Sequence, residues 1–312
     1  MESFIVALNA VIPFLIYISF GYMIRQTGMV DEPFLNKLNQ MVFKAFFPLM
    51  MFNNMYQIDP DFVLNLRLRA VAVGSLLALI LLMYLIVPRL VKGNPQRGVI
   101  IQAIYRSNFV IFAIPLTANV FGDHNTTLAS MLVAIVIPIY NVAAVIIFES
   151  FRGGKLRPAS MIKNVCKNPM IVGAAVGFVF FLLRLSLPDC VEKPIAQFAG
   201  ATTPLALFVL GGTLRFSRIQ GDAKYLIPTL AVKMVLMPAI IIIVSVFIDF
   251  TPIERFGLFT MYATPVAAAS YPMAQNMGGD GELAGEMVVI STVVSVVTIF
   301  LWIFLMKNFG LI

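Results

Sequence analysis

The sequence predicts an all-α integral membrane protein with ten transmembrane helices, arranged as two inverted five-helix repeats. Three observations support this fold class: an apolar composition, ten long apolar stretches, and a similarity between the two halves of the chain. Of the 312 residues, 60% are hydrophobic and 12% are charged, whereas a soluble domain carries about 25% charged residues. Together with a mean hydropathy of +0.93, this composition indicates that the main solvent of the chain is lipid.

Each predicted helix is a stretch of roughly 20 mostly apolar residues, which is the length needed to cross about 30 Å of hydrocarbon. In chain order, the stretches are 3–24, 34–56, 68–88, 98–121, 126–149, 169–187, 195–214, 225–248, 253–278 and 284–306. The first repeat then occupies residues 1–150 and the second occupies residues 169–312. Residues 151–168 form a cytoplasmic linker between them.

The two halves repeat uncommon residues in the same order. The pairs related by a shift of 157 residues are Tyr105 and Tyr262, Pro115 and Pro272, Asn119 and Asn276, Gly122 and Gly279, and Asp123 and Asp280. Such recurrence indicates a duplication. Because each half holds five helices, an odd number, the second copy enters the membrane from the opposite face. Inverted repeats are typical of secondary transporters, although a purely structural duplication is the alternative, since fold alone does not fix function.

The predicted helices 98–121 and 253–278 are equivalent in the two halves, and both contain proline. The first contains Pro115, and the second contains Pro265 and Pro272. Each proline removes a backbone N–H and crowds the preceding turn. We therefore expect helix breaks at these three prolines. Since freed backbone groups need a polar partner within the membrane, the two broken helices should cross at mid-membrane. Ordinary proline kinks are the alternative.

Candidate substrate-binding residues surround these breaks. They are Tyr105, Arg106, Asn108, Tyr262, Thr264, Pro265 and Asn276, together with Lys233 from the helix 225–248. Ionisable residues at membrane depth usually mark function, and here the deep charges Lys44, Arg106 and Lys233 are all basic. The nearest carboxylates, Glu149 and Glu286, lie at helix ends. A positively biased interior suits a small organic anion. Alternatively, these side chains reach an interface or tie helices together.

Enzymatic chemistry is not expected. His124 is the only histidine, and Cys166 and Cys190 lie at opposite ends of one predicted helix, so the chain offers neither a transition-metal site nor a Cys–His or Ser–His–Asp arrangement. It also lacks the GxxxxGK[ST] loop that cradles nucleotide phosphates. We expect no cofactor.

The net charge of +7 reflects topology rather than a nucleic-acid partner. Twelve basic residues lie in loops on one predicted side: Arg25, Arg89, Lys92, Arg97, Arg152, Lys155, Arg157, Lys163, Lys167, Arg215, Arg218 and Lys224. Six lie on the other: Arg67, Arg69, Arg184, Lys193, Arg255 and Lys307. The positive-inside rule places the first set in the cytoplasm. Both termini are then extracytoplasmic, in the cell (inner) membrane.

Three segments resemble known helices of the auxin efflux carrier family. The stretch 108–116, NFVIFAIPL, followed by Gly122, resembles the fourth helix of the family. The stretch 264–280, TPVAAASYPMAQNMGGD, resembles the ninth helix, and 38–55, LNQMVFKAFFPLMMFNNM, resembles the second. The similarity spans essentially all ten helices. The short segment 150–168 looks like the prokaryotic branch, because plant members carry a long loop there.

This resemblance implies an architecture and a cargo. Helices 1, 2, 6 and 7 would form a scaffold, usually dimeric, against which a transport domain of helices 3–5 and 8–10 moves in an elevator-type alternating access. The site would be the crossing of helices 4 and 9, where Asn108 would bind a carboxylate and Pro265 would hold the opposing break. Prokaryotic relatives labelled malate or malonate permeases imply a mono- or dicarboxylate. Alternatives are a sodium-coupled symporter of the bile-acid type, an anion channel, and a membrane-embedded receptor or enzyme.

Overall fold

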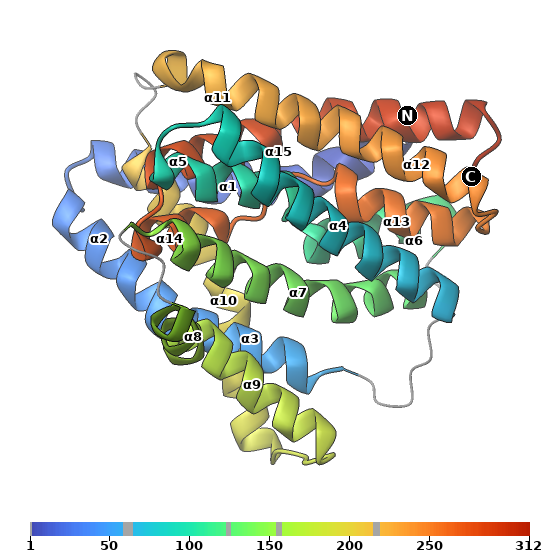
Figure 1. Ribbon diagram of the computed structural model, residues 1–312. Coiled ribbons are helices and arrows are strands. Elements are labelled where there is room, and N and C mark those ends of the chain that lie inside the picture. Colours follow the sequence, from blue (N-terminus) through green and yellow to red (C-terminus); the bar gives the residue numbers. More distant parts are fainter. Residues whose placement is uncertain (1, 59–64, 123–125, 154–157, 215–218) are drawn as a thin grey trace.

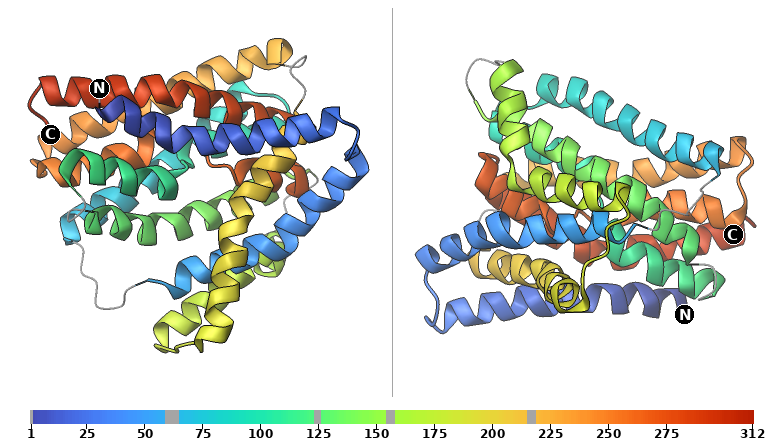
Figure 2. Two further views of the ribbon diagram at one scale, coloured as in Figure 1. Left: turned by 180° about the vertical axis from the view of Figure 1, so that it is seen from behind. Right: turned by 90° about the horizontal axis from the view of Figure 1, so that it is seen from below.

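The protein is a bundle of helices, seen in a computed structural model that describes residues 2–58, 65–122, 126–153, 158–214 and 219–312. The repeat residue Asp123 and the single histidine, His124, lie outside the described residues. Both ends of the chain lie at the same end of the bundle (Figures 1 and 2).

Several helices begin at capping residues that can be recognised in the sequence. In chain order the helices are α1 (Glu2–Gln26), α2 (Glu32–Met41), α3 (Phe47–Tyr56), α4 (Leu66–Leu90), α5 (Asn94–Tyr105), α6 (Phe109–Phe121), α7 (Thr127–Phe151), α8 (Pro158–Lys167), α9 (Pro169–Leu182), α10 (Asp189–Thr213), α11 (Ile219–Ala231), α12 (Met237–Phe247), α13 (Pro252–Ala263), α14 (Ser270–Met277) and α15 (Gly281–Asn308). Asp31 caps α2 by accepting the N–H of Phe34 at 2.8 Å, and Thr251 forms a capping box with Glu254 at the start of α13, as expected for these residue types.

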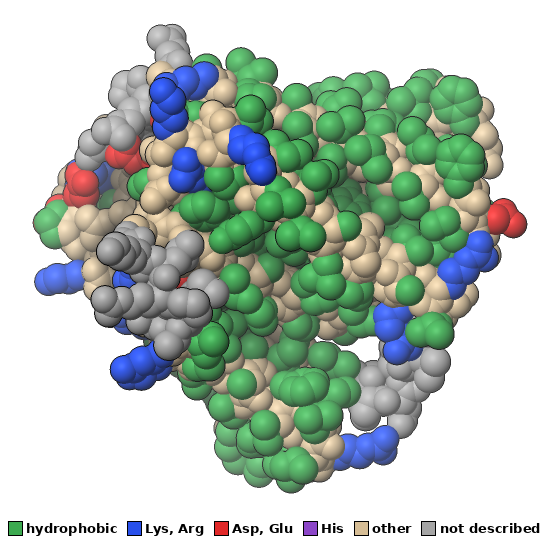
Figure 3. All heavy atoms as spheres, viewed as in Figure 1, with side chains coloured by type: hydrophobic (Ala, Val, Ile, Leu, Met, Phe, Trp, Pro, Cys, Tyr) green, Lys and Arg blue, Asp and Glu red, His purple; other side chains and the backbone are tan. Residues whose placement is uncertain are grey.

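Five helices among the described residues are long and apolar enough to cross a membrane. They are Leu66–Leu90, Thr127–Phe151, Asp189–Thr213, Gly221–Phe247 and Gly281–Asn308. Shorter apolar helices are Val11–Gln26, Phe109–Phe121 and Pro169–Leu182. On the face shown in Figure 3, apolar side chains cover the middle of the molecule. The chain is therefore an integral, multi-pass membrane protein. The count of ten spans stays a prediction, because several predicted spans are divided into shorter helices.

Glycines bring two pairs of helices into close contact. A Cβ atom on Gly21 would lie 1.9 Å from the carbonyl oxygen of Phe208, and one on Gly211 would lie 1.9 Å from that of Ile18. Small residues let membrane helices approach closely, and α1 and α10 pack backbone to backbone through these two positions. In the same way, Gly173 on α9 lies against the backbone of α3. Helices α1, α3, α9 and α10 thus form one closely packed group.

Two helices contain a π-helical turn two residues before a proline. The turn Val42–Phe46 joins α2 to α3, and the turn Val232–Leu236 joins α11 to α12. A proline has no N–H to continue the regular pattern. In each case, the backbone N–H of the residue before the proline donates to the carbonyl five residues earlier. The π turns carry Lys44 and Lys233. Lys44 is exposed, whereas Lys233 is fully buried.

The two predicted broken helices are interrupted, but only one of the breaks is at the expected residue. The second break lies between α13 and α14 and contains Pro265, as predicted. The first lies between α5 and α6, at residues 106–108, and Pro115 is inside α6. The prediction at Pro115 is wrong because a membrane helix tolerates one missing hydrogen bond without ending.

Pro272 is also not a break, since it lies in the first turn of α14. An N–H there would have no partner within the helix, so a proline costs little. The predicted linker 151–168 is not only a connection, because its second part forms the short helix α8.

Candidate functional site

The two helix breaks pair with each other at the centre of the molecule. The backbone N–H of Asn108 donates to the carbonyl of Pro265 at 2.7 Å, and the N–H of Ala267 donates to the carbonyl of Arg106 at 3.2 Å. These bonds form a single antiparallel bridge between segments from the two halves. Each break thus provides a backbone acceptor for an N–H of the other, which lowers the cost of interrupting a helix inside a membrane. The expected crossing of the two broken helices is present.

A cavity of about 470 Å³ lies against this crossing. The first break contributes Arg106, Ser107 and Asn108 to its lining, and the second contributes Ala267–Ala269. The opposite wall comes from α1, α3 and α10, which are three of the closely packed helices. The cavity therefore lies between that group of helices and the crossing.

Asn108 lines the cavity and carries a buried side-chain hydrogen-bond donor that is unused. Its side chain is 9% exposed, and its Nδ2 amide has no hydrogen-bond partner among the described residues. Buried polar groups are normally paired, so an unpaired buried amide calls for an explanation. Because this nitrogen is itself buried, it would reach a ligand oxygen in the cavity only after the Asn108 side chain turns toward the cavity.

Arg106 places a positive charge in the cavity wall without a neighbouring carboxylate. The residue is 3% exposed, and its guanidinium donates to Oδ1 of Asn141 and to Sδ of Met273. Both partners are neutral, and no carboxylate lies within ion-pair distance among the described residues. A buried charge without a counter-ion is costly. An anion in the cavity would supply the missing negative charge.

Two helix N-termini also face the cavity. The first turn of α6, from Phe109 to Ile111, lines it, as do the residues Ala267–Ala269 that lead into α14. The first N–H groups of a helix lack partners within the helix and carry the positive end of its dipole. Together with Arg106, these N-termini make the cavity suited to an anion.

Lys233 lies behind the cavity and reaches the first break from the π turn between α11 and α12. Its ammonium donates to the hydroxyl of Ser107, and Ser107 itself lines the cavity. Lys233 is fully buried and is not part of the cavity lining. It adds a second buried basic group near the crossing without direct access to the cavity.

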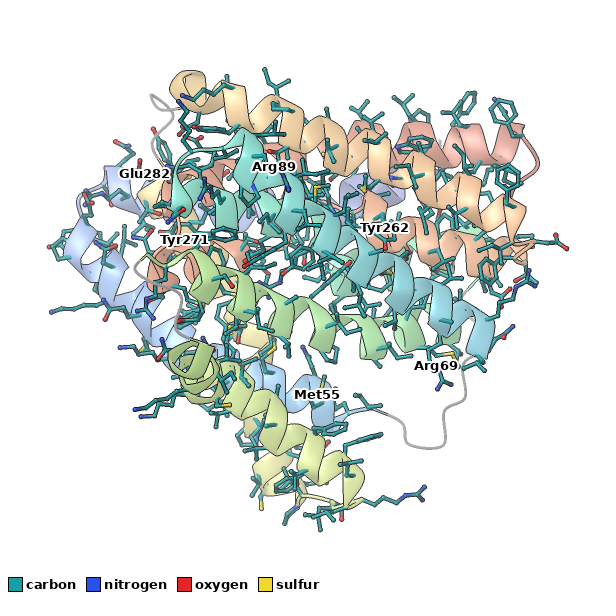
Figure 4. The ribbon with its side chains drawn as sticks, viewed as in Figure 1. Met55, Arg69, Arg89, Tyr262, Tyr271 and Glu282 are labelled. Carbon is teal, nitrogen blue, oxygen red and sulfur yellow. The ribbon has the colours of Figure 1, made fainter. Side chains whose placement is uncertain are left out.

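The two predicted tyrosines anchor the crossing to its neighbours. Tyr105 donates its hydroxyl to the carbonyl of Tyr140 on α7 at 3.3 Å. Tyr262 shares a 2.8 Å hydrogen bond with Ser75 on α4, and Figure 4 shows its position within the bundle. Both are buried and neither lines the cavity. Their contacts position the helices that end at the breaks.

Thr264, Pro265 and Asn276 also lie away from the cavity lining. Thr264 has the extended backbone expected before a proline, with ψ of 154°. Asn276 donates to the carbonyl of Pro272 at 2.8 Å within α14. Thr264 and Pro265 thus lie in the second break itself, whereas Asn276 lies near the end of the helix that follows.

Several cavity residues were not among the predicted site residues. These are Asn53, Asn54, Ser107, Tyr140, Asn141 and Thr203. Polar residues within apolar spans are the available sequence signal, and Asn53, Asn54 and Asn141 carry it. Their shared location depends on how α3 and α7 pack, which one sequence does not show. Among the described residues, no cluster of three or more His, Cys, Asp or Glu could hold a metal ion.

Comparisons with known proteins agree with this architecture. Residues 6–303 match the family described as "Membrane transport protein". An uncharacterized transporter of Methanothermobacter thermautotrophicus is 22% identical over 306 residues, covering 94% of this chain and 96% of the relative. An uncharacterized transporter of Methanocaldococcus jannaschii is 22% identical over 312 residues, covering 97% of this chain and all of the relative.

A third similar protein matches only in part. The Rhizobium meliloti protein named "Putative malonate transporter" is 26% identical over 164 residues, or 50% of each chain. The matched family is one of membrane transporters and not of enzymes. Because the family match extends over nearly the whole sequence, the chain belongs to the membrane transport protein family, the auxin efflux carrier family that its helix motifs resemble.

Proposed function

We propose that this protein is a secondary transporter of small organic anions, with mono- or dicarboxylates as the substrate class. The observation that carries the proposal is Arg106, a buried cation in the cavity wall whose partners are all neutral. The name of the Rhizobium meliloti relative supports a carboxylate substrate.

In this proposal, each residue at the crossing has a separate role. The Nδ2 amide of Asn108 donates to a substrate carboxylate oxygen, and Arg106 provides the counter-charge. The N-termini of α6 and α14 add further positive potential. Pro265 holds the second break open, because it cannot restore a regular helical hydrogen bond. Tyr105, Tyr262, Thr264 and Lys233 fix the crossing from behind.

Transport would proceed by elevator-type alternating access between two inverted five-helix repeats, 1–150 and 169–312. The closely packed helices α1, α3, α9 and α10 would be the scaffold, and the helices that carry the crossing would move against them. This division is supported by the position of the cavity, which lies between the two groups. Binding sites between discontinuous helices at a repeat interface are typical of secondary transporters.

We further propose that both termini are extracytoplasmic, in the cell membrane. The two termini share one end of the bundle (Figure 1), and the larger set of loop Lys and Arg belongs to the predicted cytoplasmic side. A homodimer formed through the scaffold is the assembly that the family resemblance implies.

A panel of carboxylates added to the purified protein tests the substrate class. A ligand present at a hundred times its dissociation constant stabilises the folded state by about 2.7 kcal/mol, which appears as a higher unfolding temperature. We expect a small mono- or dicarboxylate to stabilise the wild type and counterflow of that anion to be saturable in liposomes. Stabilisation by cations or neutral solutes alone would contradict the proposal, and flux without saturation would favour an anion channel.

The charge variants locate the binding site. Arg106→Ala should weaken carboxylate binding more than Lys233→Ala, because Arg106 lines the cavity and Lys233 does not. Arg106→Lys keeps the charge and should retain part of the affinity. Equal dissociation constants for the wild type and all three variants would show that these cations have only structural roles.

A further inference from the structure

A second cavity, of about 550 Å³, forms a groove between α7 and α9. Met131 and Ala134 line it from α7, and Ala174 and Phe178 line it from α9. Among the described residues, nearly all of its lining is apolar, and Arg69 is the single charged residue that lines it. The groove is therefore distinct in chemistry from the amide-lined cavity at the crossing.

The groove opens on the apolar surface of the molecule rather than into a polar channel. Phe178 is 45% exposed, and its neighbours on the same helix, Val176 and Val179, are exposed as well. Both α7 and α9 are apolar helices of the membrane-embedded body. An apolar groove in such a surface is filled by the surrounding lipid, because the alternative is an empty space that forfeits packing contacts.

Arg69 contributes to the lining of the groove from the first turn of α4. Figure 4 shows Arg69 and Met55 on the same side of α7, toward the space between α7 and the α3–α9 pair. The Arg69 side chain is exposed. A guanidinium has five N–H donors, so it can bind two oxygens of a phosphate while keeping another partner.

We infer that this groove is a phospholipid site, in which one acyl chain lies between α7 and α9 and the lipid phosphate contacts Arg69. Charge complementarity selects the occupant, since an anionic headgroup meets the Arg69 cation while the acyl chain meets the apolar side chains of the described lining.

The position of the groove gives this lipid a structural role. Helix α9 packs against α3 through Gly173, whereas α7 holds the crossing through the Tyr105–Tyr140 hydrogen bond. The acyl chain would thus contact both groups of helices and stabilise the arrangement in which they are seen here. This inference does not depend on which substrate the central cavity binds.

Native mass spectrometry of the detergent-purified protein, after incubation with phosphatidylglycerol, tests the site. We expect the wild type to retain one phospholipid per chain. Ala174→Trp and Ala134→Trp fill the groove from opposite walls, and each should reduce the retained fraction at least fivefold. Val176→Trp is the matched control, because it adds the same side chain to an exposed position of α9 that does not line the groove.

Two arginine variants distinguish a specific contact with the lipid headgroup from general electrostatic attraction of the lipid to the protein. Arg69→Gln should lower phosphatidylglycerol retention several-fold, whereas Arg67→Gln should leave it unchanged. Arg67 lies on the same helical turn, stacks over the Phe250 ring and does not line the groove. The inference is overturned if the groove-filling variants retain as much lipid as Val176→Trp, if both arginine variants lose lipid equally, or if a small carboxylate displaces the lipid.

Discussion

Replacing Asn108 by alanine should abolish most of the substrate affinity and leave the fold intact. The backbone N–H of Asn108 holds the crossing through Pro265, and alanine keeps that N–H. Only the side-chain amide is lost. In the structure, the Nδ2 of this amide has no partner among the described residues, so its removal breaks no hydrogen bond that Nδ2 donates to them.

The expected size of the effect follows from this geometry. A hydrogen bond to a charged group contributes about 1.5–3 kcal/mol, which corresponds to a dissociation constant roughly ten- to a hundred-fold higher. The free energy of unfolding should not fall, because an unpaired buried amide is itself unfavourable by about 1–3 kcal/mol. In this variant, the substrate affinity should therefore fall while the free energy of unfolding does not.

Isothermal titration with the stabilising carboxylate and the unfolding temperature without ligand measure the two quantities. Asn276→Ala is the control, since Asn276 bonds within α14 and does not line the cavity; its dissociation constant should match that of the wild type. An unchanged dissociation constant and normal transport in Asn108→Ala would refute the placement of the substrate at the crossing.

Three further predictions test other parts of the structure. Pro265→Ala should change the rate of counterflow more than the dissociation constant, because a restored N–H favours a regular helix across the break; an unchanged counterflow rate would exclude a role for this break in the transport cycle. Gly211→Ala should lower the unfolding temperature, because its Cβ would lie 1.9 Å from the Ile18 carbonyl oxygen; the expected loss of stability is about 1–3 kcal/mol. Gly200→Ala on the same helix is the control. Its Cβ would meet nothing within 4 Å, so the unfolding temperature should not fall. Cys166 and Cys190 are free and exposed. In single-cysteine variants, only Cys190 should react with a membrane-impermeant thiol reagent in intact cells. Reaction of Cys166 alone would contradict extracytoplasmic termini.

The sequence predicts the second break better than the first, for a physical reason. Pro265 lacks an N–H and forces Thr264 into an extended backbone, so the interruption is encoded locally. The residues Arg106–Asn108 include neither proline nor glycine. Their break depends on pairing with the second half, which is a tertiary interaction, and Pro115 was a misleading local signal because its helix continues through it.

The residues of the candidate site could also be predicted only in part. Arg106 and Asn108 are polar residues in an apolar span, and the structure places both in the cavity wall. Tyr105 and Tyr262 give the same sequence signal, yet their hydroxyls bond to neighbouring helices. Which polar residue faces a cavity and which ties two helices together depends on helix rotation about its axis. Because the segments at the breaks are not helical, the rotation of one helix does not determine the rotation of the helix that follows the break.

The hydrogen bonds at the crossing have a consequence for how the chain is made. Asn108 is synthesised 157 residues before Pro265 (265 minus 108), so its N–H and the carbonyl of Arg106 enter the bilayer before their partners exist. An unpaired backbone group in hydrocarbon costs several kcal/mol. The first half therefore cannot reach its final conformation during its own insertion and must wait for the second half to arrive. A fragment that ends near residue 150 lacks Pro265 and Ala267, so the break at Arg106–Asn108 cannot form in it as it does in the whole chain.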